Sequence, residues 1–180
     1  MVRSLIGFAS LGFGSTNTEF QATSLLILSQ IAINVTLNND IITACLNNLL
    51  RLEQCNMGQL MECLLIVFRN NSQYVMPTDT AERFLKNATM AMSLRSLAEK
   101  TSVAPLLAAV IPSLIQLALN DASMLECLKL FSECSRAEET SFIRTCMESV
   151  EKVLGDKLNL KQKENIEKVL LSLSADYSQT

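Results

Sequence analysis

The sequence predicts an all-α protein in which antiparallel helix pairs are stacked side by side as an irregular α-solenoid of about eight helices. Three observations carry this prediction: recurring helix-start motifs, a long uncharged segment that needs covering on several sides, and a scarcity of strand signals. Alternating β-branched residues are rare, and hairpin dipeptides such as Asn-Gly are absent. The short predicted loops make consecutive helices antiparallel neighbours.

The segment 102–119 is the centre of the predicted arrangement. It contains no charged residue and is apolar almost all round. A helix with this composition cannot lie on a surface, so neighbouring helices should cover at least two of its faces. Pro112 lies inside it, removes one backbone hydrogen bond and is expected to bend the helix.

Helix starts are marked by a cap-type residue with Glu or Gln three positions later. The capping side chain accepts a hydrogen bond from a free backbone N–H, while the Glu or Gln reaches back to the cap. Five such pairs precede apolar-periodic runs: Thr18 with Gln21, Asn56 with Gln59, Asp79 with Glu82, Ser135 with Glu138, and Asn159 with Gln162. With further boundaries at Asn38-Asn39-Asp40, Asn120-Asp121 and Gly155, the expected helices span 18–36, 40–53, 57–70, 79–99, 102–119, 121–134, 136–154 and 160–174.

The domain division expected from these boundaries has three parts. Residues 1–17 form a poorly ordered or partner-packed lead-in, because Gly7, Gly12 and Gly14 interrupt its short apolar run. Residues 18–174 form a single solenoid segment, and residues 175–180 form a tail.

An internal match supports stacked helical units. Shifting the sequence by 64 residues aligns 41–70 with 105–134 without a gap and brings Glu62-Cys63-Leu64 onto Glu126-Cys127-Leu128. The shift spans three of the expected helices, which does not suit a strict two-helix repeat. Either the repeat is irregular, or the match reflects the general composition of helix pairs.

Composition limits the functional classes. Hydrophobic residues make up 49% of the chain and charged residues 18%, and the mean hydropathy is positive, so we expect apolar surface that something else covers, as in a segment of a longer protein. The net charge of -3 and the absence of a long basic stripe disfavour direct nucleic-acid binding. No apolar run reaches the roughly 18–20 residues that span a bilayer.

The cysteines are interpreted as buried, reduced thiols in a reducing intracellular compartment. They lie within apolar helical patterns, there is no C-x-x-C pair, and the chain has no histidine. Disulfides and a metal site are the alternatives. The six are Cys45, Cys55, Cys63, Cys127, Cys134 and Cys146.

Catalytic signatures are missing. The sequence has no nucleophile elbow, P-loop, dinucleotide fingerprint or metal signature. Glu62 and Glu126 occupy matching positions beside a cysteine, so a catalytic carboxylate pair is conceivable, but helix-surface residues are the simpler interpretation. We expect no enzymatic activity, no cofactor and no small-molecule substrate.

The C-terminal helices carry most of the charge, whereas the first 80 residues carry little. The lysines near the C-terminus are interleaved with acidic residues, which is typical of a solvated helix surface. Contact with an anionic partner is the alternative, and both interpretations stay open. The residues concerned are Lys152, Lys157, Lys161, Lys163 and Lys168.

The Pro-containing segment 102–119, the Asn120-Asp121 turn and the following helix at 124–134 resemble a HEAT unit, although Glu126 lies near the position where HEAT units often have Arg. A HEAT- or armadillo-like α-solenoid is therefore the expected fold.

A narrower resemblance rests on apolar spacing in 20–32 with Thr36-Leu37, in 62–69 before a Pro-containing loop, and in 106–117. These stretches look like the central part of the large HEAT-repeat family of the small-subunit processome, called HEAT repeat-containing protein one or U-three protein ten. The resemblance covers roughly 18–119. It implies a non-catalytic nucleolar scaffold that holds assembly factors on nascent pre-ribosomal RNA.

Two functions remain. The first is a scaffold segment that binds proteins through helix faces, contacts RNA only indirectly through a larger assembly, and does not bind membranes. The second is a self-contained helical-bundle adaptor whose core encloses an apolar ligand or a partner helix. A row of stacked helices favours the first, and a closed globule favours the second.

Overall fold

The computed structural model describes residues 2–50, 56–135, 139–155 and 157–177, and every regular element in these ranges is an α-helix. The predicted all-α class is confirmed, with ten helices rather than about eight. Their bounds are α1 Val2–Phe13, α2 Thr18–Asn34, α3 Asn39–Leu49, α4 Met57–Asn70, α5 Thr78–Leu85, α6 Met90–Ala98, α7 Ala104–Asn120, α8 Met124–Cys134, α9 Glu139–Leu154 and α10 Leu160–Tyr177.

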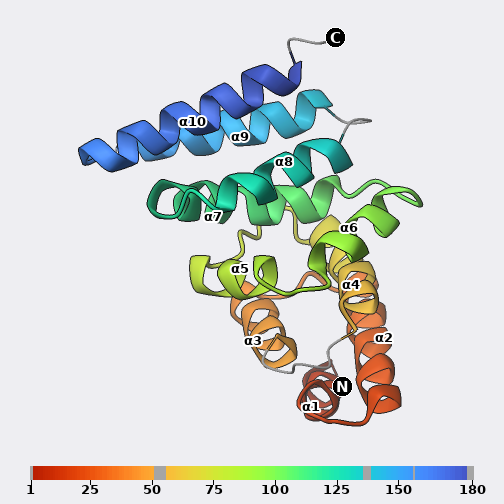
Figure 1. Cartoon of the computed structure of the whole chain (residues 1–180). Coiled ribbons are helices and arrows are strands. Elements are labelled where there is room, and N and C mark those ends of the chain that lie inside the picture. The colour runs from red at the N-terminus through yellow and green to blue at the C-terminus, as the bar shows by residue number, and fades with distance from the viewer. Residues whose placement is uncertain (1, 51–55, 136–138, 156, 178–180) are drawn as a thin grey trace.

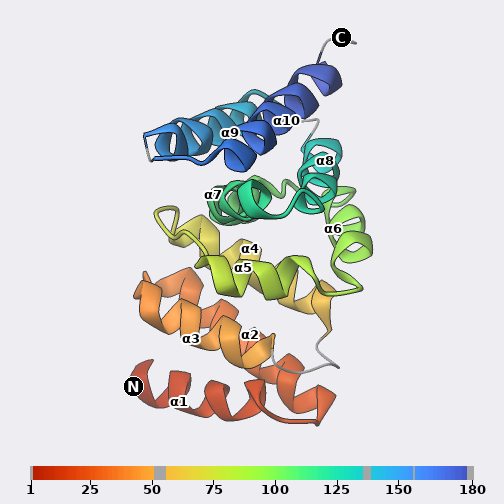
Figure 2. The same ribbon diagram turned by 60° about the vertical axis from the view of Figure 1, so that its left-hand side comes forward.

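The helices form two layers that run along one axis (Figures 1 and 2). Odd-numbered helices contact one another in order from α1 to α9, and even-numbered helices do so from α2 to α10. The first helix pair lies at one end of the stack and the last pair at the other (Figure 2). Each pair therefore packs against its sequence neighbours, as in a solenoid.

Helix α7 is central, as its uncharged sequence predicts. It contacts α4, α5, α8, α9 and α10, and its side chains at Leu106, Val110, Ile111 and Leu114 are fully buried. Coverage on several faces removes from water a helix that is apolar nearly all round.

Pro112 lies inside α7 as expected, and the chain segment before α5 docks beside it. The Met76 N–H donates to the Ala109 carbonyl at 2.8 Å, and the Ser113 hydroxyl donates to the Met76 carbonyl at 2.5 Å. A proline cannot donate a backbone hydrogen bond, so it loosens the helical ladder at this turn. Pro112 has no N–H to offer to the carbonyl of Ala108, four residues earlier. The next carbonyl, of Ala109, accepts from Met76 in the neighbouring segment.

Two of the five expected helix-start pairs match the structure directly. Asn56 caps α4 by accepting from the Gln59 N–H, and Asn159 and Gln162 before α10 exchange two hydrogen bonds, at 2.9 and 3.1 Å. The second arrangement is a complete capping box.

The other three pairs differ. The cap of α2 is Asn17, one residue before Thr18, and it accepts from the backbone N–H groups of Glu19 and Phe20. Pro77 precedes α5 without a side-chain cap, which leaves Asp79 in the first turn, where its charge favours the helix N-terminus. The pair at Ser135 includes Glu138, which lies outside the described residues.

The helix count was wrong at two places. The segment 79–99, expected as one helix, is divided into α5 and α6. At the break, the Asn87 side-chain oxygen accepts from the N–H and the hydroxyl of Thr89, two residues later, and this local bonding competes with a continuous helix. The sequence also placed no helix before Thr18, whereas α1 packs along α2 and buries Ala9 and Phe13. Because 79–99 forms two helices, the 64-residue shift corresponds to two helix pairs. It places α3 and α4 on α7 and α8.

Glycine explains why α1 packs so closely. A methyl group on Gly12 would overlap the Ser24 hydroxyl and lie 2.9 Å from the Phe20 carbonyl oxygen of α2, whereas a methyl group on Gly7 would meet nothing within 4 Å. In the sequence, Gly12 is one of three glycines that interrupt the short apolar run of the lead-in. In the structure, Gly12 is a contact point instead.

Each junction between consecutive pairs also contains side-chain hydrogen bonds. Asn71, directly after α4, accepts from the Leu37 N–H. The Arg83 guanidinium and the Thr80 hydroxyl of α5 donate to Asn47 of α3, and Asn165 of α10 donates to the Leu119 carbonyl of α7. An ion pair between Arg95 and Glu133 at 3.2 Å joins α6 to α8. These directional bonds fix the axial position of each pair on the next.

The two glycines of α1 give a matched test of the packing. We expect Gly12→Ala to lower the free energy of unfolding by about 1–3 kcal/mol, because α1 must move away from α2. Gly7→Ala should raise the free energy of unfolding by up to about 1 kcal/mol through helix propensity alone. Urea unfolding monitored by circular dichroism measures both, and hydrogen exchange should show loss of protection confined to α1 and α2 in the first variant. Equal effects of the two substitutions would contradict close packing at Gly12.

Candidate interaction surfaces

A long apolar groove lies between α1 and α2 at the N-terminal end of the stack. It has a volume of about 450 Å³ and is lined by Leu5, Leu26, Ile27, Gln30, Ile31, Asn34 and Val35. Leu26, which lines the groove, is 62% exposed, and Leu11 on α1 is 69% exposed. A concentration of exposed apolar side chains of this kind marks a place where another surface binds.

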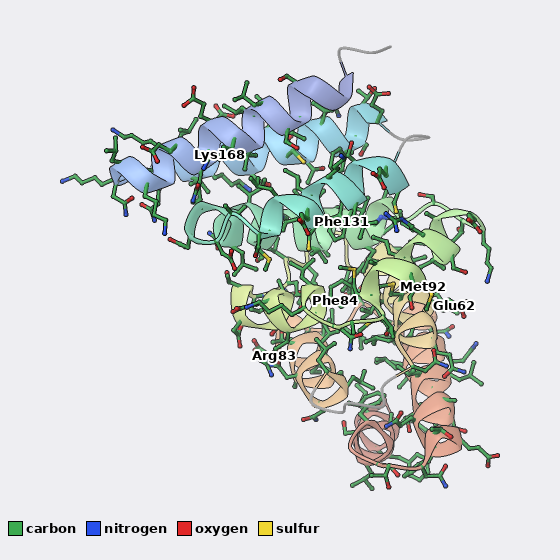
Figure 3. The ribbon with its side chains drawn as sticks, in the orientation of Figure 1. Glu62, Arg83, Phe84, Met92, Phe131 and Lys168 are labelled. Carbon is green, nitrogen blue, oxygen red and sulfur yellow. The ribbon has the colours of Figure 1, made fainter. Side chains whose placement is uncertain are left out.

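A second groove of about 330 Å³ lies between α4 and α6 in the even-numbered layer. Gly58 and Glu62 contribute from α4, and Met92, Ser96 and Lys100 come from α6 and the residues after it. Met92 is 70% exposed, and Figure 3 shows it beside Glu62. This groove combines a flexible apolar side chain with opposite charges, so it suits a polar protein segment better than an apolar ligand.

The five lysines proposed from the sequence lie at the C-terminal end. Lys152 is on α9, Lys157 lies in the connection before α10, and Lys161, Lys163 and Lys168 are on α10. All five side chains are exposed, and Figure 3 shows Lys168 at this end of the stack. None of them belongs to a salt bridge within the ranges that the structure describes.

One of these lysines faces a charged neighbour that the sequence did not indicate. The pKa of Asp121 is lowered by hydrogen bonds from the hydroxyl and the N–H of Ser123, and to a smaller extent by the charges of Lys86 and Lys161. Lys86 and Lys161 therefore flank the turn between α7 and α8. No spacing rule connects them, because they are brought together by the stacking of α5, α7 and α10.

The carboxylates considered for catalysis are not assembled into one site. Glu62 is exposed on α4 and Glu126 is exposed on α8, and α6 packs between these two helices in the even-numbered layer. In the described part of the chain, no group of three or more Asp, Glu, Cys or His side chains is arranged to bind a metal ion. The two glutamates lie on α4 and α8, the second helices of two different pairs.

Burial keeps the cysteine thiols protonated by raising their pKa. Loss of hydration raises the pKa of Cys45 and of Cys63 to about 11 and that of Cys146 to about 12. The Cys63 thiol also donates to the Leu25 carbonyl at 3.4 Å. Burial likewise raises the pKa of Cys127 and Cys134, which are partly exposed. All five described cysteines are free thiols, whereas Cys55 lies outside the described residues.

Comparison with protein families identifies the class of the stack. The family model described as U3 small nucleolar RNA-associated protein 10 matches residues 1–114, from α1 to Leu114 within α7. The chain belongs to this family. U3 small nucleolar RNA-associated protein 10 is a HEAT-repeat family of the small-subunit processome, which places the chain in ribosome biogenesis and ribosomal RNA processing in the nucleolus. The resemblance drawn from residues 18–119 is thereby confirmed.

Other comparisons add no relative. No curated protein and no solved structure matches the chain. The family is one of structural proteins associated with a small nucleolar ribonucleoprotein and is not a known enzyme family. In the ranges that the structure covers, no helix has the length and hydropathy needed to cross a membrane.

The sequence did not predict either groove. The low charge of the first 80 residues pointed to a covered surface, but its position depends on α1, which was not expected to be helical. The groove between α4 and α6 depends on the division of 79–99 into two helices.

Thiol reactivity provides a test of this cysteine environment. At pH 8, we expect Cys127 and Cys134 to react with a maleimide well before Cys45, Cys63 and Cys146, with peptide mass spectrometry assigning each site. Because burial raises the folded-state pKa, the stabilising contribution of the buried thiols is complete below about pH 9 and is lost as the pH rises towards 11–12. The free energy of unfolding should fall across that window. Equal labelling rates in the native and denatured protein would contradict the burial.

Proposed function

We propose that the chain is a non-catalytic scaffold segment that binds protein partners through its helix faces during small-subunit ribosome assembly. Contact with pre-ribosomal RNA is indirect, through the larger assembly. The observation that carries this proposal is the two-layered stack, which exposes grooves between neighbouring helices and leaves Glu62 and Glu126 separated. The extended arrangement favours a scaffold over a closed bundle that encloses a ligand.

Compartment and chemistry are consistent with this function. The five described cysteines are free, and the three most buried have a raised pKa, which suits a reducing intracellular compartment. Cofactors and small-molecule substrates are not part of the proposal. The lysines at the C-terminal end remain a candidate surface for an anionic partner, and their alternative role is to keep this end of the stack solvated.

RNA binding distinguishes the two interpretations of the lysines. We expect the isolated chain to bind RNA no more tightly than about 10⁻⁵ M at physiological salt, as for weak non-specific contacts. Replacing Lys152, Lys157, Lys161, Lys163 and Lys168 by Gln should leave that affinity unchanged within about twofold, as should a control with Lys86, Lys100 and Lys129 replaced. Fluorescence anisotropy at several salt concentrations measures both. Loss of affinity and of salt dependence in the first variant alone would support an anionic-contact surface instead.

Complementation in cells tests the scaffold role. Depletion of the protein should cause small-subunit ribosomal RNA precursors to accumulate, and a double variant Glu62→Gln and Glu126→Gln should restore processing because neither carboxylate takes part in chemistry. Northern blotting of precursor and mature RNA provides the measurement. A control pair, Glu99→Gln with Glu148→Gln, changes the same charge at other exposed positions. The non-catalytic assignment fails if Glu126→Gln alone, expressed equally, does not restore processing while the control pair does. Loss of processing in Glu62→Gln alone would instead point to partner binding at the groove between α4 and α6, which Glu62 lines.

A further inference from the structure

The groove between α4 and α6 lies on the flank of the stack rather than at one of its ends. Along the even-numbered layer, α4 already packs between α2 and α6, and α6 packs between α4 and α8. Units of a solenoid stack on one another along the axis of the row, so this stacking does not cover the flank. The groove is therefore a surface for a different molecule and not a stacking position.

Two exposed side chains of opposite charge line this groove, Glu62 from α4 and Lys100 just after α6. Neither forms a salt bridge with another residue in the ranges that the structure describes. The next junction of the same layer differs, because Arg95 of α6 and Glu133 of α8 pair across it at 3.2 Å. A molecule bound between α4 and α6 thus meets an available acid and an available base.

The rest of the lining leaves room for side chains of a partner. A methyl group on Gly58 would have only the Asn56 Oδ1 atom within 4 Å, at 3.4 Å, so the groove is open at this point. Met92 is 70% exposed beside Glu62 (Figure 3), and its flexible thioether adapts to the shape of an incoming apolar side chain. On the α6 side the lining runs from Met92 to Lys100, which spans about 12 Å at a helical rise of about 1.5 Å per residue.

This lining disfavours other classes of occupant. A nucleic-acid backbone would bring phosphates beside the Glu62 carboxylate, where like charges repel. A wholly apolar ligand would remove Glu62 and Lys100 from water without providing an ion partner for either. An amphipathic helix meets both demands, because side chains three or four residues apart share one face and can be charged or apolar.

We propose that the groove between α4 and α6 binds an amphipathic helix, about two turns long, of a partner protein. A basic side chain of this helix faces Glu62, an acidic one faces Lys100, and an apolar one packs against Met92. The inference rests on the proposed scaffold function and specifies the partner chemistry of one of its surfaces. Because both charges stay partly hydrated, the ion pairs set orientation and specificity, and Met92 supplies most of the affinity.

A displayed library of random peptides, each about four helical turns long, supplies the probe and is selected against the full 180-residue chain. We expect the recovered peptides to place a basic, an apolar and an acidic residue on one helical face. Met92→Glu should weaken their binding by at least about tenfold, as measured by fluorescence anisotropy of the synthetic peptides. The matched control is Met147→Glu at a methionine of α9 that is 47% exposed, and it should change affinity by less than about twofold.

Charge reversal tests the orientation of the helix. Glu62→Gln should lower affinity by less than about fivefold, because an exposed ion pair contributes little, and this small loss is compatible with normal processing in cells. Glu62→Lys should lower affinity by at least about tenfold through repulsion. A peptide whose basic residue is replaced by Glu should bind the Glu62→Lys variant and not the wild type. The control reversal, Glu126→Lys on α8, should have no effect.

The outcomes separate this inference from the scaffold function. Peptides that lose affinity with Leu26→Glu and not with Met92→Glu occupy the groove between α1 and α2, which overturns the inference and leaves the scaffold function in place. Self-association of the chain that Met92→Glu abolishes assigns the groove to a second copy and also overturns it. A selection that recovers no peptide overturns it as well, while complementation in cells reports on the scaffold function independently. Met92 and Glu62 are exposed, so their substitution opens no core cavity, and circular dichroism with urea unfolding confirms that each variant folds.

Discussion

The need to cover α7 determines the rest of the architecture. A helix that is apolar nearly all round cannot be stable with one partner, and α7 is accordingly packed by helices from the pairs before and after it. This contact converts a series of helix pairs into a continuous core that extends from α4 to α10. A pair on its own would leave apolar surface in water, so stacking is the way in which each pair becomes stable.

Apolar stacking alone leaves the pairs free to slide along one another, and the side-chain hydrogen bonds remove that freedom. Asn71, Asn47 and Asn165 each bridge two successive pairs with an amide. Pro112 contributes in a different way, because the weakened helical ladder next to it receives the Met76 peptide group. The side-chain amides and the backbone acceptor beside Pro112 both hold neighbouring units in position.

The sequence predicted those features that depend on local chemistry or on composition. The cap at Asn56, the capping box at Asn159, the boundary at Gly155 and the central position of α7 follow from side-chain hydrogen bonding and apolar periodicity within one segment. The errors arose where a contact distant in the sequence decides the outcome. The close contact of Gly12 with Ser24 on α2 could not be predicted, because it exists only once the two helices are packed. The grooves were missed for the same reason, since each is formed by two helices of which one was misplaced.

The two ends of the stack differ in a way that bears on function. The C-terminal pair alternates lysines and acids on exposed positions, which keeps an end of a solenoid in solution, whereas the N-terminal pair exposes leucines around a groove. The polarity of the stack therefore changes along its axis. The apolar groove lies at the first helix pair, and the surfaces further along the stack place polar and charged side chains around smaller apolar areas.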